Sequence, residues 1–313
     1  MRIVIFFLLL FQISGLFAQQ KSVVLKDTSF TNQSAYQKEK KKYPFIKMVN
    51  LLLPKSIKKK ENVVYKTIGD RKLALDIFYA KEKTKQTRAA VLLIHGGGWK
   101  SGDKNQNYDQ AIKLAENGYV AITVEYRLSL EAKYPAAILD IKSAVQWIRI
   151  NAKKYQINPN KIAVMGFSAG GQLAALLGTT NNQAIFKNES LFSDEVQAVI
   201  NVDGLLAFKH PESEEGVSAA LWLGGTYNEA PQNWEQASAL SHVNKNSTPI
   251  LFINSANPRF HAGRTDMISK LKSFSIYSEV REFPDTPHTF WLFEPWFEPV
   301  MNHTLKFLDR VFK

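Results

Sequence analysis

The chain has 313 residues, of which 45% are hydrophobic, 12% aromatic and 22% charged. This composition excludes an intrinsically disordered chain and a fibrous repeat, because neither has enough apolar content for a packed core. The chain contains no cysteine, which excludes disulfides and thiolate metal sites. The formal net charge is +12, so the position of the basic residues decides whether a polyanionic partner is expected.

Residues 1–18 have the pattern of a secretory signal peptide. A single cation, Arg2, precedes a short apolar run that ends before Gln19 and Gln20. The run is too short to be a membrane span, so we expect cleavage after Ala18 and a secreted or periplasmic protein. An uncleaved membrane anchor is the alternative interpretation. We expect no integral membrane span elsewhere in the chain.

Residues 19–60 form a basic N-terminal arm. The stretch from Lys21 to Lys66 holds 12 lysines and three acidic residues, whereas the rest of the chain to Lys313 has 27 basic and 25 acidic residues. One interpretation is a solvated, partly helical lead-in to the folded domain. The other is attraction to an acidic polymer, such as a polysaccharide that carries uronic acids. We expect no nucleic-acid partner, because aromatic residues do not alternate with the basic ones.

From residue 61 to residue 313 the pattern predicts one α/β domain. Two alternating segments predict an antiparallel hairpin, and continuous apolar runs after it predict strands that are buried on both faces. The predicted strands are Val63–Thr67, Leu73–Tyr79, Ala89–Ile94, Tyr119–Val124, Lys161–Gly166, Val196–Val202, Pro249–Ile253 and Tyr277–Phe283. Helices are predicted over Asp103–Glu116, from Pro135 onward, and over Ala169–Leu177, Thr265–Phe274 and Pro299–Phe312. This alternation predicts a mostly parallel sheet with helices on both faces, and residues 205–243 fit a small cap insertion.

A G-x-S-x-G motif, Gly166–Gly170, lies between a predicted strand and a predicted helix. A tight turn with small neighbours at that point exposes the oxygen of Ser168 above the sheet. The sequence therefore predicts a nucleophilic serine. The alternative is an ordinary glycine-rich turn.

A glycine run, His95–Trp99, follows the predicted strand Ala89–Ile94. Backbone N–H groups in such a loop are free to point at a developing oxyanion. The N–H of Ala169, at the start of a helix, completes the predicted cradle.

With these motifs the chain resembles the α/β-hydrolase esterases, and within them the branch of bacterial feruloyl and acetyl-xylan esterases and their hormone-sensitive-lipase-like relatives. The segments that carry the resemblance are HGGGW (95–99), YR (126–127), YPAAILD (134–140) and GFSAGGQLA (166–174). The resemblance implies the α/β-hydrolase fold, with Ser168 as nucleophile and Gly97, Gly98 and Ala169 as the oxyanion hole.

The same resemblance implies a histidine base after the last strand, where His288 follows Phe283 by a short loop. Relatives carry an acid after the strand Pro249–Ile253, but here Asn257 stands near that position. Asp266, further along the same loop, is therefore the favoured acid. Asp203, which ends the preceding strand, is the alternative.

Two clusters predict substrate contacts. Arg259 and Arg264 border the expected acid loop, and guanidinium groups suit bidentate binding of carboxylates. Trp291 follows the predicted base, and Trp99 ends the glycine run. Exposed rings of this kind stack on sugars, although dense aromatic residues also occur in cores. No motif implies a metal or a cofactor.

The sequence thus predicts a secreted serine esterase that removes acetyl, feruloyl or methyl ester groups from a polysaccharide. A peptidase or lipase of the same fold is one alternative, and neither a propeller domain nor a long apolar lid is evident to favour it. A catalytically inactive α/β-hydrolase binding module is the other, because the identity of the acid is open.

Overall fold

The computed structural model describes residues 27–312, apart from residues 83, 85, 187–189 and 215. The predicted signal peptide, residues 1–18, lies outside the described residues. The strands are β1 (Lys47–Met48), β2 (Ile57–Ile68), β3 (Arg71–Ala80), β4 (Arg88–Ile94), β5 (Val120–Val124), β6 (Ile157–Phe167), β7 (Ala198–Val202), β8 (Ile250–Ser255), β9 (Ser278–Phe283) and β10 (Phe293–Glu294). The helices are α1 (Asn32–Glu39), α2 (Tyr108–Glu116), α3 (Ala136–Ile150), α4 (Ala152–Tyr155), α5 (Ala169–Thr179), α6 (Val217–Leu223), α7 (Pro231–Ala237), α8 (Arg264–Ser273) and α9 (Phe297–Phe312).

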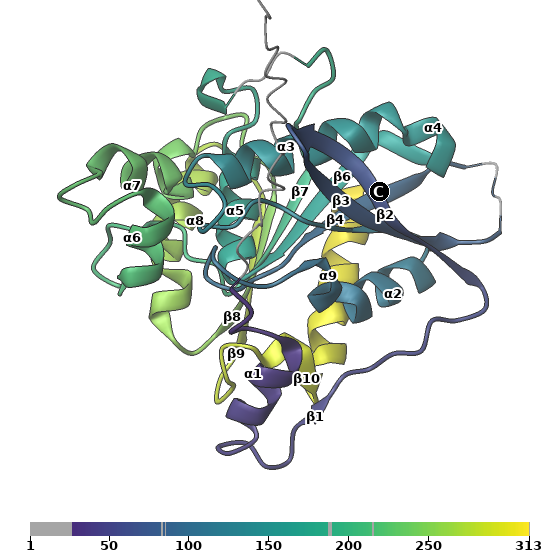
Figure 1. Cartoon of the computed structure of the whole chain (residues 1–313), viewed down its shortest axis with the longest axis horizontal. Helices are drawn as coiled ribbons and strands as arrows, with labels where there is room; N and C mark the ends of the chain where they lie inside the picture. The colour runs from purple at the N-terminus through teal and green to yellow at the C-terminus, as the bar shows by residue number, and fades with distance from the viewer. Residues whose placement is uncertain (1–26, 83, 85, 187–189, 215, 313) are drawn as a thin grey trace, which may run out of the picture.

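An eight-stranded sheet in the order β2-β3-β5-β4-β6-β7-β8-β9 forms the centre of the molecule (Figure 1). β3 runs antiparallel to both of its neighbours, β2 and β5, and the pairs from β5 through β9 are all parallel. The predicted fold class, a mostly parallel sheet with helices around it, is confirmed. Because parallel strands end at the same edge, the loops after β4, β6 and β7 meet there.

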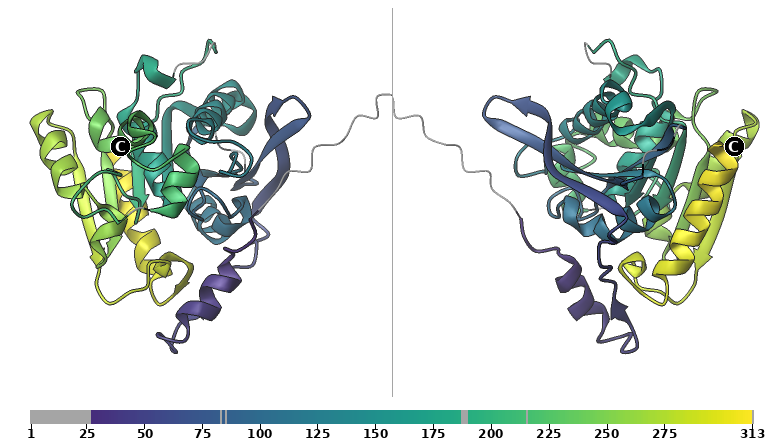
Figure 2. Two further views of the ribbon diagram at one scale, coloured as in Figure 1. Left: turned by 60° about the vertical axis from the view of Figure 1, so that its left-hand side comes forward. Right: turned by 90° about the vertical axis from the view of Figure 1, so that its right-hand side faces the viewer.

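The continuous apolar strands are buried on both faces, as their sequence predicts. Within β4, Leu92 and Ile94 face a core that also contains residues of α3 and α5, whereas Val91 and Leu93 face a second core with α2 and α9. Figures 1 and 2 show these helices on the two sides of the sheet. Two covered faces hold the strand ends, and hence the loops that follow them, in fixed positions.

The N-terminal arm is partly helical and its lysines are exposed from Asp27 to Val49, as the lead-in interpretation expects, but this part also packs against the folded domain. β2 begins at Ile57, and Lys58–Lys60 pair with Ile77–Tyr79 of β3, so the domain boundary expected at residue 61 is too late. β1 pairs with β10 beside the C-terminal helix, and Ala35 of α1 is buried. These elements are hard to predict from the sequence because lysines predominate there. The few apolar residues between the lysines make the contacts with the rest of the domain.

Residues 205–243, the predicted cap insertion, contain α6 and α7. Trp222 of α6 is fully buried and stacks on Trp99, with ring centroids 5.1 Å apart and planes 9° apart. Phe208 packs against both rings. The aromatic residues of this segment therefore fasten it to the body of the molecule.

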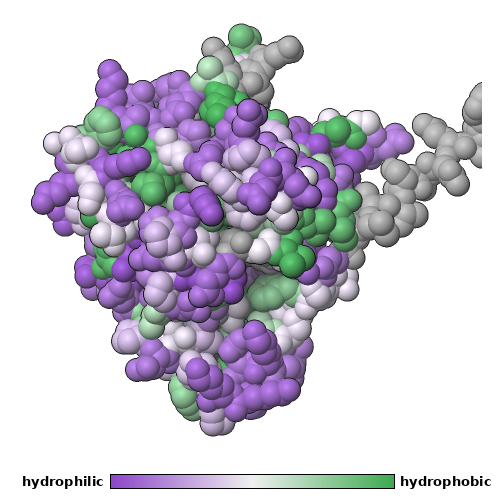
Figure 3. Space-filling model, turned by 90° about the vertical axis from the view of Figure 1, so that its left-hand side faces the viewer, coloured by the Kyte–Doolittle hydropathy of each residue, from purple (hydrophilic) through white to green (hydrophobic). Residues whose placement is uncertain are grey.

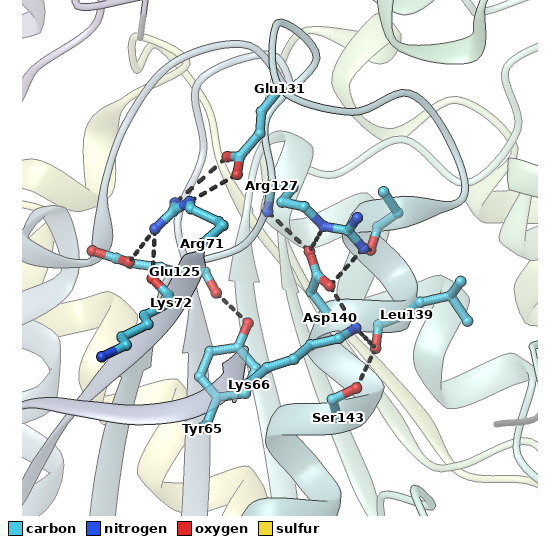
Figure 4. Close-up of polar contacts among 11 residues, drawn as sticks. Tyr65, Lys66, Arg71, Lys72, Glu125, Arg127, Glu131, Leu139, Asp140 and Ser143 are labelled. Carbon is cyan, nitrogen blue, oxygen red and sulfur yellow. Dashed lines mark hydrogen bonds and ion pairs between the residues drawn. The ribbon is translucent and has the colours of Figure 1, made fainter. Parts of the chain in front are cut away.

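A buried carboxylate joins three elements near the cap (Figure 4). Asp140 of α3 is fully buried and accepts hydrogen bonds from Lys66 of β2 at 2.7 Å and from the Arg127 side chain at 2.8 Å. Arg127 belongs to the loop after β5. In the same figure Arg71 of β3 bonds Glu131 of that loop. These ion pairs fix the loop after β5 against the hairpin and α3.

Replacing Asp140 by Asn should lower the free energy of unfolding by roughly 3 kcal/mol, because Lys66 and Arg127 lose the charge that compensates them. Urea denaturation measures the loss. Glu298→Gln is the control, since the Lys113–Glu298 pair, 2.7 Å long, leaves Glu298 42% exposed. That substitution should cost about 1 kcal/mol or less. Equal losses for the two variants would contradict the structural role of Asp140.

Candidate active site

Ser168 lies at a strained turn between β6 and α5. Its backbone has φ 53° and ψ −120°, a conformation that residues with side chains rarely adopt. Gly166 permits the turn, because a Cβ atom there would lie 2.0 Å from the carbonyl oxygen of Gly170. The Ser168 N–H donates to the carbonyl of Val202 at 2.9 Å, which ties the turn to the end of β7. The strained turn holds the hydroxyl above the edge of the sheet.

The structure brings Ser168, His288 and Asp203 into one hydrogen-bonded line. The Nε2 atom of His288 lies 2.8 Å from the Ser168 Oγ, and its Nδ1 lies 3.0 Å from the Asp203 Oδ2. Asp203 follows β7 and His288 follows β9, so the three side chains come from separate loops at one edge of the sheet. This is the geometry in which a carboxylate orients an imidazole that takes a proton from a serine.

Asp203 is held by the backbone around it. Its side chain is fully buried, and its Oδ1 accepts from the Ser255 N–H at 2.8 Å and from the Asn254 Nδ2 at 3.4 Å. Its own N–H donates to the Ile253 carbonyl at 3.0 Å. Two donors on one oxygen leave the other oxygen to His288, so the carboxylate has a single orientation.

The structure does not place Asp266 at the site, so the preference for Asp266 over Asp203 is wrong. Asp266 lies in the first turn of α8, where its carboxylate contacts the Nε2 of His210 at 3.2 Å and is 62% exposed. The loop after β8 does not fold back as expected, because Gly263 starts the helix directly. The sequence gives no local sign of this, since both aspartates follow a buried parallel strand.

The predicted oxyanion donors surround the serine. Gly97, Gly98 and Ala169 line the same cleft as Ser168. The N–H of Ala169 belongs to the first turn of α5, where a helix offers no acceptor of its own. Gly97 has φ 118°, and a Cβ atom there would lie 2.2 Å from the Ser101 carbonyl oxygen. The position therefore requires glycine.

Three hydrogen bonds hold the loop that carries these glycines. The Tyr126 hydroxyl donates to the His95 carbonyl at 2.9 Å, and the N–H and Oγ of Ser129 both donate to the Trp99 carbonyl, at 2.8 and 2.9 Å. Tyr126 and Ser129 flank Arg127, the partner of Asp140. The ion-paired loop after β5 thus buttresses the glycine loop.

Aromatic rings enclose the imidazole of His288. Phe260 stacks on it with ring centroids 3.4 Å and planes 11° apart, and Trp291 meets it edge-on at 5.3 Å. The guanidinium of Arg259 lies 4.9 Å from the centroid of the Phe260 ring. Phe260 and Trp291 therefore restrict the ring of His288 to the orientation that its two hydrogen bonds require.

Another histidine, His261, also lies close to the acid. Burial lowers the pKa of His261, and the nearby charge of Arg264 adds to the effect. The attraction of Asp203 opposes these two causes. A lowered pKa favours the neutral ring of His261.

The four residues predicted to bind substrate have different surroundings. Arg259 and Trp291 line the cleft. Trp99 also borders it, but its ring is 3% exposed and its indole N–H donates to Gln172 at 2.9 Å. Arg264 is not a lining residue of the cleft as described, and bonds Asn254 at 3.0 Å and Glu282 at 2.8 Å. It supports Asn254, the residue that contacts Asp203, so the contacts of Arg264 in the structure are structural.

The cleft has a volume of about 490 Å³, in the range of small-molecule sites. Figure 3 shows a recess with an apolar floor on this face of the molecule, above the hydrophilic lower part where α1 lies. Residues of the N-terminal segment line it, including Phe30 and Lys38, and Ser218 of α6 lies at its border. Sequence reasoning missed Phe260, Ser255 and the N-terminal residues, because none of them lies in a motif.

Among the described residues, no group of three or more histidine or acidic side chains is arranged to hold a metal ion. Nor does any helix of the described part have the length and apolar character needed to cross a membrane.

Comparison with known proteins gives one family and several relatives. The model of the BD-FAE family matches residues 75–260, more than half of the chain. The esterase LipC of Mycobacterium tuberculosis is 30% identical over 188 residues, which cover 58% of this chain and 47% of that protein. The chain spans about half the length of the curated relatives it matches.

Solved structures share the fold. A truncated carbohydrate esterase from gut microbiota has a TM-score of 0.68 at 22% identity, covering 80% of this chain and 96% of its own. An esterase of the planctomycete Thermogutta terrifontis, with propionate bound, has a TM-score of 0.67 at 23% identity, covering 82% and 95%. At these identities the likeness establishes the α/β-hydrolase architecture.

The choice between the two aspartates can be tested through the reactivity of Ser168. We expect a fluorophosphonate probe to label Ser168, because His288 takes up the proton of its hydroxyl. Asp203→Asn should slow labelling by on the order of 10³-fold, since the imidazolium loses its carboxylate. Asp266→Asn makes the same change of charge on the exposed partner of His210 and should stay within about threefold of the native rate. Mass spectrometry of the labelled peptide follows both rates, and the reverse ranking would contradict the geometry.

Proposed function

Because the chain belongs to the BD-FAE family of α/β-hydrolase esterases, we propose that it is a secreted serine hydrolase of carboxylic esters on a polysaccharide. The ester groups are acetyl, feruloyl or methyl. The observation that carries the proposal is the line of hydrogen bonds from Asp203 through His288 to Ser168 at the end of an open cleft.

Acylation begins when the Ser168 Oγ attacks the carbonyl carbon of the ester while the Nε2 of His288 takes up its proton. The carbonyl oxygen becomes an oxyanion, and the N–H groups of Gly97, Gly98 and Ala169 donate to it. One such donor typically contributes about 3 kcal/mol to stabilisation of the transition state. The oxyanion then collapses, His288 returns the proton to the leaving alcohol, and an acyl-serine remains.

Deacylation repeats these steps with water. His288 takes a proton from the attacking water, the oxyanion forms in the same cradle, and Ser168 leaves with the proton that His288 returns. In both steps the imidazole becomes positively charged. The buried carboxylate of Asp203 stabilises that charge and fixes which nitrogen carries the proton.

A sugar ester as substrate is supported by the shape of the cleft and by the comparisons. A volume of about 490 Å³ accommodates an acyl group together with part of an oligosaccharide. One of the similar structures is a carbohydrate esterase. The cleft border is also basic at its N-terminal side, which supports contact with an acidic polymer.

The inactive binding module is the weaker alternative. A binding module has no need of a buried carboxylate held by two donors behind a histidine that reaches a strained serine. The peptidase and lipase alternatives share the same line of residues and differ in substrate, so they are separated by assay.

Ser168→Ala should abolish turnover of 4-nitrophenyl acetate and change Tm by no more than about 2 °C, because the hydroxyl contacts only His288 and the cleft. Spectrophotometric assay and calorimetry measure the two effects. Turnover near the native rate in the variant would remove the basis of the mechanism.

A panel of polymers tests the substrate class, with the Ser168→Ala variant as the blank. We expect release of acid or methanol from at least one of acetylated xylan, acetylated pectin, methylated pectin and feruloylated arabinoxylan. Activity on tributyrin or casein without activity on any of the four polymers would favour the lipase or peptidase alternative.

Export is proposed from the first 18 residues of the sequence. Expression of the full chain in a Gram-negative host should yield a periplasmic or extracellular protein that begins at Gln19, as N-terminal sequencing would determine. A mature protein that retains Met1 would contradict the proposal.

A further inference from the structure

The N-terminal segment from Asp27 to Val49 crosses one side of the cleft and is attached at both ends. At its start, Asp27 bridges to Ser101 and its carboxylate lies 3.3 Å from the Nζ of Lys100, next to the glycine loop. At its end, β1 pairs with β10 and the Val49 N–H donates to the Leu292 carbonyl at 3.2 Å. Both Leu292 and β10 follow His288 closely in the chain. The segment therefore joins the loop of the oxyanion donors to the loop of the base.

Between these attachments the segment contributes a wall to the cleft. Six of its residues line the cleft together with Ser168 and His288: Ser29, Phe30, Ser34, Ala35, Lys38 and Glu39. The Asn32 Nδ2 donates to the Gln106 carbonyl at 3.1 Å, which holds the start of α1 against the body. Figure 2 shows α1 extending beyond the sheet on the side where β10 lies. A substrate bound at Ser168 and large enough to fill the cleft therefore contacts this wall.

The wall has an apolar part close to the base. Phe30 packs against the core that contains Trp291 and Leu292, and all three residues line the cleft. Ala35 is buried in the same core. A ring or a sugar face that lies along the wall therefore meets apolar surface beside the reacting serine.

The outer part of the wall is basic. Residues 27–49 contain five lysines, all exposed, against two acidic residues. Lys38 lines the cleft with its side chain 82% exposed, whereas its partner Glu39, 3.5 Å away, is 16% exposed. Lys100 and Arg259 are the other cations of the lining. Each of these three cations has an acidic partner, Glu39, Asp27 or Glu214. The excess positive charge on this side of the cleft therefore comes from the remaining exposed lysines of residues 27–49, and it favours anionic groups of a substrate.

We propose that this segment, Asp27–Val49, determines specificity and selects esters on chains that carry carboxylates, such as polymers of uronic acids. The proposal rests on the proposed ester hydrolase function and narrows its substrate. The matched part of the BD-FAE family model begins at residue 75, so the wall lies outside the part of the chain that the family describes. Lys38 binds the carboxylate of a neighbouring sugar while Phe30 contacts its ring.

The test compares two acetylated trisaccharides that differ in charge, acetylated trigalacturonate and acetylated trigalactose. We expect Lys38→Glu to lower the ratio of kcat/KM for the acidic over the neutral substrate by about three- to tenfold at low salt. The control is Lys58→Glu, which makes the same change in net charge on an exposed residue of β2 and does not belong to the cleft lining as described. We expect that variant to keep the native ratio.

A second pair of variants tests the apolar part of the wall. Phe30→Ala should lower kcat/KM for acetylated trigalacturonate, relative to that for 4-nitrophenyl acetate, by about fivefold, because the larger substrate loses a ring contact. Phe45→Ala is the matched control, since Phe45 belongs to the same segment, is 60% exposed and contacts Tyr43 and Trp296 instead of the cleft. We expect it to keep the native value.

The outcomes separate the two proposals. The selection of acidic substrates would be overturned if the ratio of kcat/KM for the acidic over the neutral substrate is the same in the native enzyme, Lys38→Glu and Lys58→Glu. It would also be overturned if both variants change this ratio equally. Ester hydrolysis stands in either case. If Phe30→Ala and Phe45→Ala behave alike, the wall does not bind the substrate. A native enzyme inactive on both trisaccharides and on 4-nitrophenyl acetate would overturn ester hydrolysis itself, and the inference with it.

Discussion

The close contact between the backbones of β6 and α5 determines the position of Ser168, and the other groups of the site are arranged around that residue. Gly166 touches Gly170 there, and a Cβ atom on Gly170 would lie 2.2 Å from the carbonyl oxygen of Ile94 in β4. Three segments therefore meet without side chains between them, and Ser168 must adopt its left-handed φ to connect the strand to the helix. The loops after β4, β7 and β9 are then within reach of one hydroxyl. The packing of the whole sheet offsets the energetic cost of the strained backbone at Ser168.

The oxyanion loop depends on residues far from the serine. Asp140 binds Arg127, and the neighbours of Arg127 in the loop after β5 donate to the carbonyls of His95 and Trp99. Trp99 in turn stacks on Trp222 of the cap segment. The glycines between these two carbonyls have little conformational preference of their own, so their N–H groups keep a fixed direction because the carbonyls on either side are held. Preorganisation of the cradle is thus supplied by an ion pair and by aromatic packing.

Local sequence patterns predict most of the fold. They also predict Ser168 and His288, two of the three residues in the hydrogen-bonded line. The strands are continuous apolar runs, and both Ser168 and His288 lie in short segments next to a strand end, where chain order predicts their position. The acid differs, because Asp203 and Asp266 each follow a buried strand and only tertiary contacts distinguish them. The Ser255 N–H orients Asp203, whereas the helix start at Gly263 directs Asp266 toward His210. The basic charge of the N-terminal segment is evident in the sequence, but its place in the cleft lining is not, because the lysines of residues 38–42 dominate the pattern while Phe30 and Ala35 make the contacts.

The segment Asp27–Val49 is attached at both ends to loops of the site but lies outside the central sheet. The hydrolase core contributes the serine, the histidine and the acid. The segment pairs with it at Ser101 and at β10, and between these points Asn32 and the apolar residues of α1 contact it. A substitution on the outer face of α1 leaves the packing of the sheet unchanged, so this surface can accumulate changes that the core does not tolerate. Replacing residues on that face would therefore reshape the border of the cleft while leaving Ser168, His288 and Asp203 in place.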